Sequence, residues 1–178
     1  EHVVRGDITA ADGTVLAKTT VNGDGSETRE YPYGRMFAHV VGYMNNGKGG
    51  LESQYNFNLL RSHSFFLTQI INDLKDQKNT GDTLVTTLDY DVQKAAYDAL
   101  GDRDGAVVVM EPKTGKILAM VSKPDYDPNT LVDKWDDIVS DDSSSVLLNR
   151  VTSGLYPPGS TFKIFTTLEY VHENPNYQ

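Results

Sequence analysis

The 178-residue sequence predicts an α+β fold, in which a β-rich N-terminal module is followed by a second β-hairpin and helices. Three observations lead to this prediction. Residues 7–19 alternate in polarity around Asp12-Gly13, which is typical of a β-hairpin. Residues 105–122 contain two apolar runs joined by a Pro-Lys-Thr-Gly turn, which indicates another hairpin. Residues 160–174 repeat apolar side chains at helical spacing, which predicts a helix.

The first 80 residues predict further short elements. Residues 20–30 are polar and rich in glycine, so we expect a loop there. Residues 37–44, "FAHVVGYM", have the composition of a buried strand. The apolar residues of "LESQYNFNLL" (51–60) recur every four positions, which predicts a helix, and a second helix is expected over residues 64–76.

The strongest break in the pattern is "NTGD" at residues 79–82, which we interpret as a domain boundary. It separates an N-terminal module, residues 1–80, from residues 81–178.

After this break, residues 83–88 have the character of a strand. Asp89 is placed to cap a helix over residues 90–100, and Gly101 follows where a left-handed residue commonly ends a helix. Residues 124–145 are rich in Asp, Pro and Ser and predict an irregular segment.

Composition excludes several classes of function. Sixteen basic and 25 acidic residues give a net charge of −9, which argues against a nucleic-acid partner. The absence of cysteine excludes disulfides, thiolate nucleophiles and cysteine zinc sites. The four histidines lack metal-binding spacing, and the acidic residues at 136, 137, 141 and 142 lack the pattern of a calcium loop. We therefore expect neither a metal nor a cofactor.

The segment "YPPGSTFK" (156–163) carries the clearest chemical signal. The two prolines enforce an extended approach, and Gly159 permits a sharp turn. Ser160 then lies in the first turn of a helix, where free N–H groups favour negative charge. Lys163 follows one turn later, with its amine within reach of the serine hydroxyl. A serine, an amine base and N–H donors together can perform acyl transfer.

A Ser-x-x-K tetrapeptide also has an ordinary structural interpretation, in which the serine caps the helix and the lysine is solvated. The residues alone leave both interpretations open, although Pro-Pro-Gly raises the weight of the catalytic one. The same tetrapeptide occurs among the motifs of β-lactamases and penicillin-binding proteins.

A resemblance favours the catalytic interpretation. "NRVTSGLYPPGSTFK" closely resembles the active-site region of class B penicillin-binding proteins, the peptidoglycan D,D-transpeptidases. "RGDITAADGTVLAKT", "YPYGRMFAHVVGY" and "GGLESQYNFNLL" are similar to the three motifs of that family's N-terminal pedestal. "TLVTTLDYDVQKAA" and "GAVVVMEPKTGKILAMVSKPDYDPN" resemble the entry into its transpeptidase domain. The resemblance therefore runs through most of the chain, in family order.

The resemblance implies that Ser160 is the nucleophile, acylated by the D-Ala-D-Ala end of a stem peptide or by a β-lactam. Lys163 would be its base, and the Ser160 N–H would form half of the oxyanion hole. It also implies that Arg5, Gly6 and Glu52 fix the N-terminal module against the catalytic one. The fold is then a short pedestal followed by the first part of a serine-transpeptidase domain.

The sequence also departs from the family pattern. It contains no Ser-x-Asn motif, and its single Lys-Thr-Gly, residues 113–115, precedes Ser160 and occupies the predicted hairpin turn. We therefore expect this Lys-Thr-Gly to be structural and the chain to be a fragment that ends after the Ser160 helix. A fragment of this kind is expected to be inactive and to expose an apolar helix face.

The resemblance further implies an extracytoplasmic location, with membrane attachment only through an anchor outside this chain. Cell-wall synthesis proteins are expected partners of the pedestal. Two other functions remain open. A serine β-lactamase or β-lactam sensor would share the chemistry of Ser160 and Lys163, and a non-catalytic interaction module would use the pedestal alone.

Overall fold

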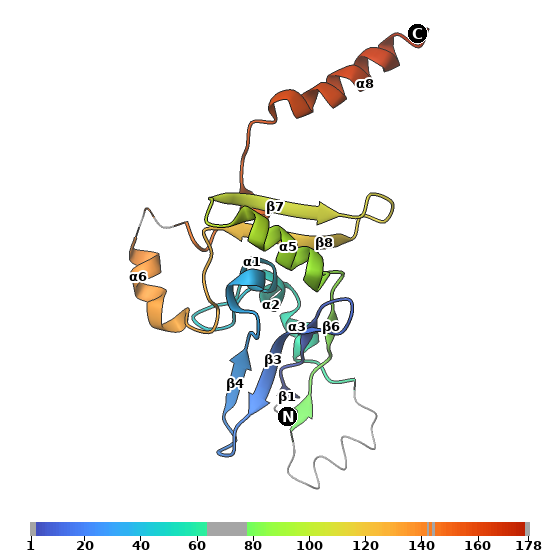
Figure 1. Ribbon diagram of the computed structural model, residues 1–178. Helices are drawn as coiled ribbons and strands as arrows, with labels where there is room; N and C mark the ends of the chain where they lie inside the picture. The colour runs from blue at the N-terminus through green and yellow to red at the C-terminus, as the bar shows by residue number, and fades with distance from the viewer. Residues whose placement is uncertain (1–2, 64–77, 142, 144, 177–178) are drawn as a thin grey trace.

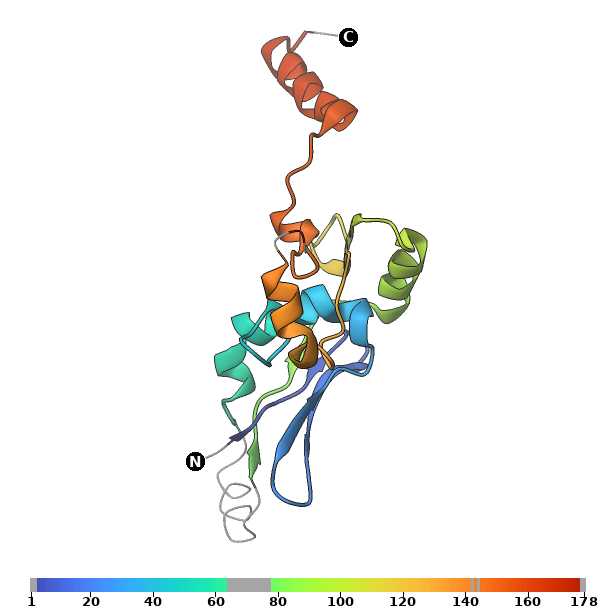
Figure 2. The same cartoon turned by 90° about the vertical axis from the view of Figure 1, so that its left-hand side faces the viewer.

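The computed structural model describes residues 3–63, 78–141, 143 and 145–176. Figure 1 shows a body of small sheets and helices from which the last helix, α8 (Lys163–Glu173), extends outward, and Figure 2 shows the same projection from a perpendicular direction. In the described part of the chain, no helix has the length and apolar character needed to cross a bilayer. The mixed fold predicted from the sequence is confirmed.

Two small sheets organise the N-terminal part. Strands β2 (Ile8–Thr9) and β3 (Val15–Val21) form the expected hairpin, with Asp12-Gly13 in its turn. The sheet continues through β4 (Glu27–Glu30) and β6 (Leu84–Val85) in the order β4-β3-β2-β6. Strand β1 (Val3–Val4) pairs in parallel with β5 (Asn79–Thr80). Strand β6 contains only two of the six residues 83–88 for which a strand was predicted.

The loop predicted for residues 20–30 is wrong, because β3 and β4 form a second hairpin there. Its strands pair through polar residues, with Thr20 Oγ1 donating to Glu30 Oε1 at 2.8 Å and Lys18 lying 3.1 Å from Glu30. Such cross-strand pairs stabilise a solvated ribbon that has no apolar alternation. The hydrophobic pattern therefore gave no sign of it.

The strand predicted for residues 37–44 is also wrong. The segment forms a 3₁₀ turn, η1 (Gly34–Phe37), and the short helix α1 (Ala38–Val41), which ends at Gly42 with φ of +92°. Phe37 and Val41, four residues apart, point into the core. A short apolar run does not distinguish a strand from a buried helix, and here packing selects the helix.

The helix predicted for residues 51–60 is confirmed with one interruption. It consists of α2 (Gly50–Gln54) and α3 (Asn56–Leu59), with Tyr55 outside helical geometry between them. The helix predicted for residues 64–76 lies outside the described residues. Leu59 is fully buried in a core with Ile8, Leu16 and Phe37.

The second half is built on the hairpin of β7 (Gly105–Met110) and β8 (Ile117–Lys123), as predicted. Helix α5 (Tyr90–Leu100) lies against this hairpin (Figure 1) and ends at Gly101, where φ is +58°. The region predicted to be irregular also contains η2 (Val132–Lys134) and helix α6 (Trp135–Ser140). Helix α7 (Arg150–Ser153) then leads through residues 154–158 to η3 (Gly159–Phe162) and α8.

Asp89 caps α5 as predicted, since its Oδ1 accepts a hydrogen bond from Val92 N at 3.0 Å. Replacing Asp89 with alanine should lower the free energy of unfolding by about 1 kcal/mol, the usual effect of losing an N-cap. In a chain of this size that corresponds to about 3 °C in the thermal midpoint. Thermal denaturation followed by circular dichroism measures it, with Asp104→Ala, at an exposed position, as control. Equal midpoints for the two variants would contradict the capping role.

Candidate active site

The segment around Ser160 is shaped by glycine and proline. Gly159 has φ of +55°, the left-handed value that the sharp turn was expected to require. Ser160 lies in η3, and Lys163 is the first residue of α8. The turn is closed by Thr161, whose Oγ1 donates to Pro158 O at 2.5 Å. The helix predicted to begin at Ser160 therefore begins as a 3₁₀ turn.

This 3₁₀ geometry bears directly on the serine–lysine pair. Residues i and i+3 of a 3₁₀ turn lie on the same face. The backbone N–H of Lys163 bonds back to Ser160 O within this turn. Ser160 and Lys163 thus occupy positions from which a serine hydroxyl and an amine can meet.

Both side chains are exposed to solvent. The apolar face of α8 is exposed as well, with Ile164, Phe165 and Leu168 each at 63%. This agrees with the exposed helix face predicted from the sequence. A nucleophile and its base in open water lack the low-dielectric surroundings in which oxyanion stabilisation is strong.

The internal Lys-Thr-Gly is a turn, as expected. Residues 113–115 connect β7 to β8, and Gly115 has φ of +75°. Gly115 N donates to Glu111 O at 2.9 Å, and Glu111 N donates to Lys116 O at 2.9 Å. The residues that match this motif therefore serve the hairpin.

A buried charge cluster holds the N-terminal module together. Glu52 is fully buried, with Oε2 lying 2.6 Å from Arg5 Nε and Oε1 lying 2.7 Å from Arg29 Nε. Arg5 also donates to Asn56 Oδ1 and to Glu52 O, and Tyr31 Oη donates to Glu52 Oε1 at 3.3 Å. Burial and the Glu52 charge raise the pKa of Tyr31, so its hydroxyl stays protonated.

The expected role of Arg5 and Glu52 needs correction. In the described part of the chain, their side-chain partners lie within residues 5–56, so the cluster fixes the N-terminal module internally. No sequence pattern singled out Arg29, whose Nη1 also binds Gly6 O at 2.8 Å. Gly6 does meet the second half, because a Cβ atom there would lie 2.1 Å from Asp82 O.

Three amide side chains of the second half, and not the charge cluster, bind the N-terminal module. Asn129 accepts from Tyr31 N at 2.9 Å and donates to Tyr31 O at 3.0 Å. Gln93, fully buried, donates to Met36 O at 2.7 Å. Asn149 donates to His39 O at 3.1 Å. No spacing rule singles out these residues, because each amide binds the backbone of a segment distant in sequence.

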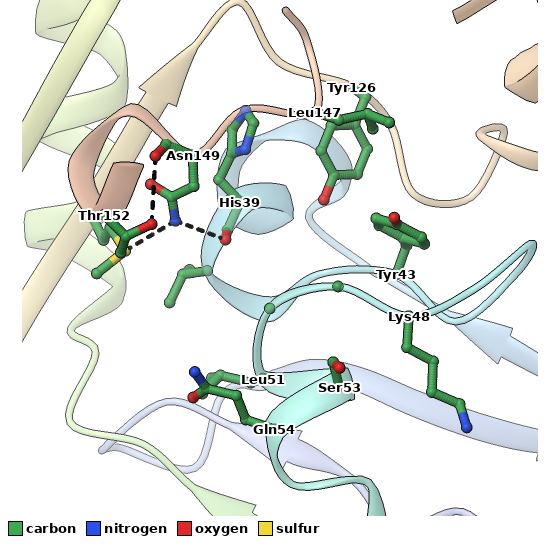
Figure 3. Close-up of a pocket in the computed structure, with 14 residues that line it drawn as sticks. His39, Tyr43, Lys48, Leu51, Ser53, Gln54, Tyr126, Leu147, Asn149 and Thr152 are labelled. Atoms are coloured by element: carbon green, nitrogen blue, oxygen red, sulfur yellow. Dashed lines mark hydrogen bonds between the residues drawn. The ribbon is translucent and has the colours of Figure 1, made fainter. Parts of the chain in front are cut away.

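A pocket of about 460 Å³ lies at the same junction. Figure 3 shows Asn149 and Thr152 on the left with His39 next to Asn149, Tyr43 on the right, and Leu51 below. Burial lowers the pKa of His39, so the neutral ring donates from Nε2 to Pro124 O at 3.1 Å. His39 is therefore a structural residue of this junction. Nowhere in the described residues do three His, Asp or Glu side chains converge as metal ligands.

Comparisons with known proteins agree with this architecture. Residues 5–84 match the family described as the penicillin binding protein A dimerisation domain, and residues 105–174 match the penicillin binding protein transpeptidase domain. The chain is 38% identical to the peptidoglycan D,D-transpeptidase PbpA of Mycolicibacterium smegmatis over 92% of its own length and 36% of that protein. It thus spans about a third of this curated relative.

Solved structures give the same result. A penicillin G acyl-enzyme complex of penicillin-binding protein A from M. tuberculosis is 34% identical, with a TM-score of 0.85 over 96% of this chain and 43% of the other. The D,D-transpeptidase domain of a peptidoglycan glycosyltransferase from Eggerthella lenta is 38% identical, with a TM-score of 0.78 over 92% of this chain and 36% of the other. The two family matches, these relatives and the shared fold identify the chain as a member of the class B penicillin-binding proteins, the family of the peptidoglycan D,D-transpeptidases.

Proposed function

We propose that the longer protein containing this chain is a peptidoglycan D,D-transpeptidase in which Ser160 is the nucleophile and Lys163 its base. The observation that carries this proposal is the 3₁₀ turn that places the two residues on one face at the start of α8. The turn lies inside the segment that matches the transpeptidase family. A relative of the same fold forms an acyl-enzyme with penicillin G.

In the proposed reaction, Ser160 Oγ attacks the carbonyl carbon between the two D-alanines of a stem peptide, and the Lys163 amine takes the hydroxyl proton. The Ser160 N–H stabilises the oxyanion. The C–N bond then breaks, and the terminal D-alanine leaves with the proton returned by Lys163. The amine of a second stem peptide attacks the ester, forms the crosslink and frees the serine. A β-lactam acylates Ser160 by opening its ring in the first step.

Intact-mass spectrometry after incubation with penicillin G tests this assignment. The longer protein should gain the mass of one penicillin, and its Ser160→Ala variant should gain none. An equal adduct on both proteins would exclude Ser160 as the nucleophile. Rapid loss of the adduct by hydrolysis would instead favour the β-lactamase or sensor function.

The 178-residue polypeptide itself is expected to show no adduct under these conditions. Ser160 and Lys163 lie in water here, outside the low-dielectric surroundings in which N–H donors strongly stabilise an oxyanion. Stoichiometric labelling that disappears in Ser160→Ala would show instead that the serine, the lysine and the 3₁₀ turn suffice.

We also propose that the boundary between the two modules lies between residues 80 and 81. We propose in addition that the longer protein acts on the extracytoplasmic side of the membrane, because peptidoglycan lies there. An interaction role for the N-terminal module is favoured by the match of residues 5–84 to a dimerisation domain. Sedimentation equilibrium of the 178-residue polypeptide tests self-association, and a monomer at all concentrations would contradict it.

A further inference from the structure

Asn149 makes two different hydrogen bonds with its one side chain. Its Oδ1 accepts from Val151 N at 3.0 Å and so caps α7. Its Nδ2 donates to His39 O at 3.1 Å, in α1 of the N-terminal module, and lies 3.5 Å from Met120 Sδ (Figure 3). One residue therefore fixes both the start of α7 and its position against the N-terminal module.

The rest of α7 is held by β8. The hydroxyl of Ser122, a buried residue, donates to Leu148 O at 3.0 Å and accepts from Arg150 N at 3.0 Å. These bonds lie on either side of Asn149 in the sequence. The first turn of α7 is consequently attached to two elements at once, α1 through Asn149 and β8 through Ser122.

Helix α7 is also the last element before the candidate nucleophile. Only residues 154–158 separate it from the η3 turn that carries Ser160. Gly154 leaves no room for a side chain, because a Cβ atom there would lie 2.4 Å from Arg150 O and 2.5 Å from the Tyr156 ring. The direction in which the chain leaves α7 is therefore set by packing, and Pro157 and Pro158 stiffen the approach to the η3 turn.

We propose that Asn149 is a positioning residue through which the N-terminal module orients the Ser160 segment. The His39 carbonyl holds the Asn149 amide, Asn149 holds the first turn of α7, and α7 sets the origin and direction of the chain leading to Ser160. The proposal rests on the proposed function of Ser160, and it adds a role for the N-terminal module in the rate of acylation.

The chain offers variants that separate the two bonds. Asn149→Ser keeps an N-cap of equal rank but is too short to reach His39 O, whereas Asn149→Ala loses both bonds. Asn129→Ala is the matched control, because Asn129 also binds the N-terminal backbone, at Tyr31, but lies on the loop after β8 and not on α7. Each variant is made in the longer protein and in the 178-residue polypeptide.

The first measurement is the rate constant for acylation of the longer protein by a fluorescent penicillin, with the thermal midpoint recorded in parallel. Losing one neutral hydrogen bond corresponds to about a fivefold change. We expect Asn149→Ser to be slowed by about this factor and Asn149→Ala, which also loses the cap, to be slowed at least as much. Asn129→Ala should react at the wild-type rate, although it loses two bonds to Tyr31 and its midpoint falls at least as far as that of Asn149→Ser. Wild-type rates in Asn149→Ser, or equal slowing in Asn129→Ala, would overturn the proposal.

The second measurement is hydrogen exchange of the Arg150, Ser153 and Gly154 amides in the 178-residue polypeptide. Faster exchange in Asn149→Ser but not in Asn129→Ala supports the tether to His39, and unchanged exchange overturns it. The hydrogen-exchange measurement does not depend on catalysis. If the wild-type longer protein is never acylated, the function assigned to Ser160 fails, and the tether is still decided by exchange.

Discussion

Replacing Glu52 with alanine should lower the free energy of unfolding of the 178-residue polypeptide by about 3 to 5 kcal/mol. Glu52 is fully buried and is the carboxylate partner of both Arg5 and Arg29, whose side chains are 3% and 2% exposed. Glu52 is the carboxylate that pairs with both arginines among the described residues, so its removal leaves two buried guanidinium groups of like charge without this counter-ion. The cost comes from these stranded charges more than from the lost attraction.

Urea denaturation followed by fluorescence measures this loss, and Glu30→Ala is its control. Glu30 also pairs with a cation, but Lys18 and Glu30 are 45% and 40% exposed, so that variant should lose far less stability than Glu52→Ala. A loss of similar size in both variants would show that the buried cluster contributes no more than a surface ion pair.

Replacing Lys163 with alanine in the longer protein should slow acylation by penicillin by about 10² to 10⁴, the range attributed to a positioned general base. Noncovalent binding of the β-lactam should change far less, because the amine acts on the proton of Ser160. Stopped-flow measurement of the acylation rate against penicillin concentration separates these two quantities.

Two further variants make this result specific. Lys113→Ala, in the hairpin turn, should acylate at the wild-type rate, because residues 113–115 only connect β7 to β8. Lys163→Arg keeps the positive charge but cannot give up its proton, so it should be as slow as Lys163→Ala. If Lys163→Arg reacts normally, the lysine contributes charge and not basicity.

Features set by neighbouring residues could be predicted from the sequence. The Asp12-Gly13 hairpin, the Asp89 cap and the β7–β8 hairpin depend on turn and cap chemistry within a few positions, and the structure confirms them. The Ser160-x-x-Lys163 spacing is local for the same reason. Turn and cap residues form hydrogen bonds with residues a few positions away, so the sequence pattern alone predicts them.

Features set by distant contacts could not be predicted. Residues 37–41 fold as the end of a 3₁₀ turn and a short helix, because Phe37 and Val41 pack into a core supplied by other elements. The place of Arg29 in the buried charge cluster could not be predicted, because its partner, Glu52, lies 23 residues away. The amides at the junction of the two halves were missed for the same reason, since their partners are main-chain atoms between 57 and 110 residues distant.

The chemistry of that junction has a consequence for substitution. Gln93, Asn129 and Asn149 bind the main chain of Met36, Tyr31 and His39, and every amino acid offers the same carbonyl oxygen. The three hydrogen bonds therefore depend on the position of the backbone and not on the type of side chain that it carries. These three hydrogen bonds therefore place no demand on the side chains of Met36, Tyr31 and His39. Tyr31 and His39 are constrained separately, by the bonds of their own side chains to Glu52 and to Pro124 O.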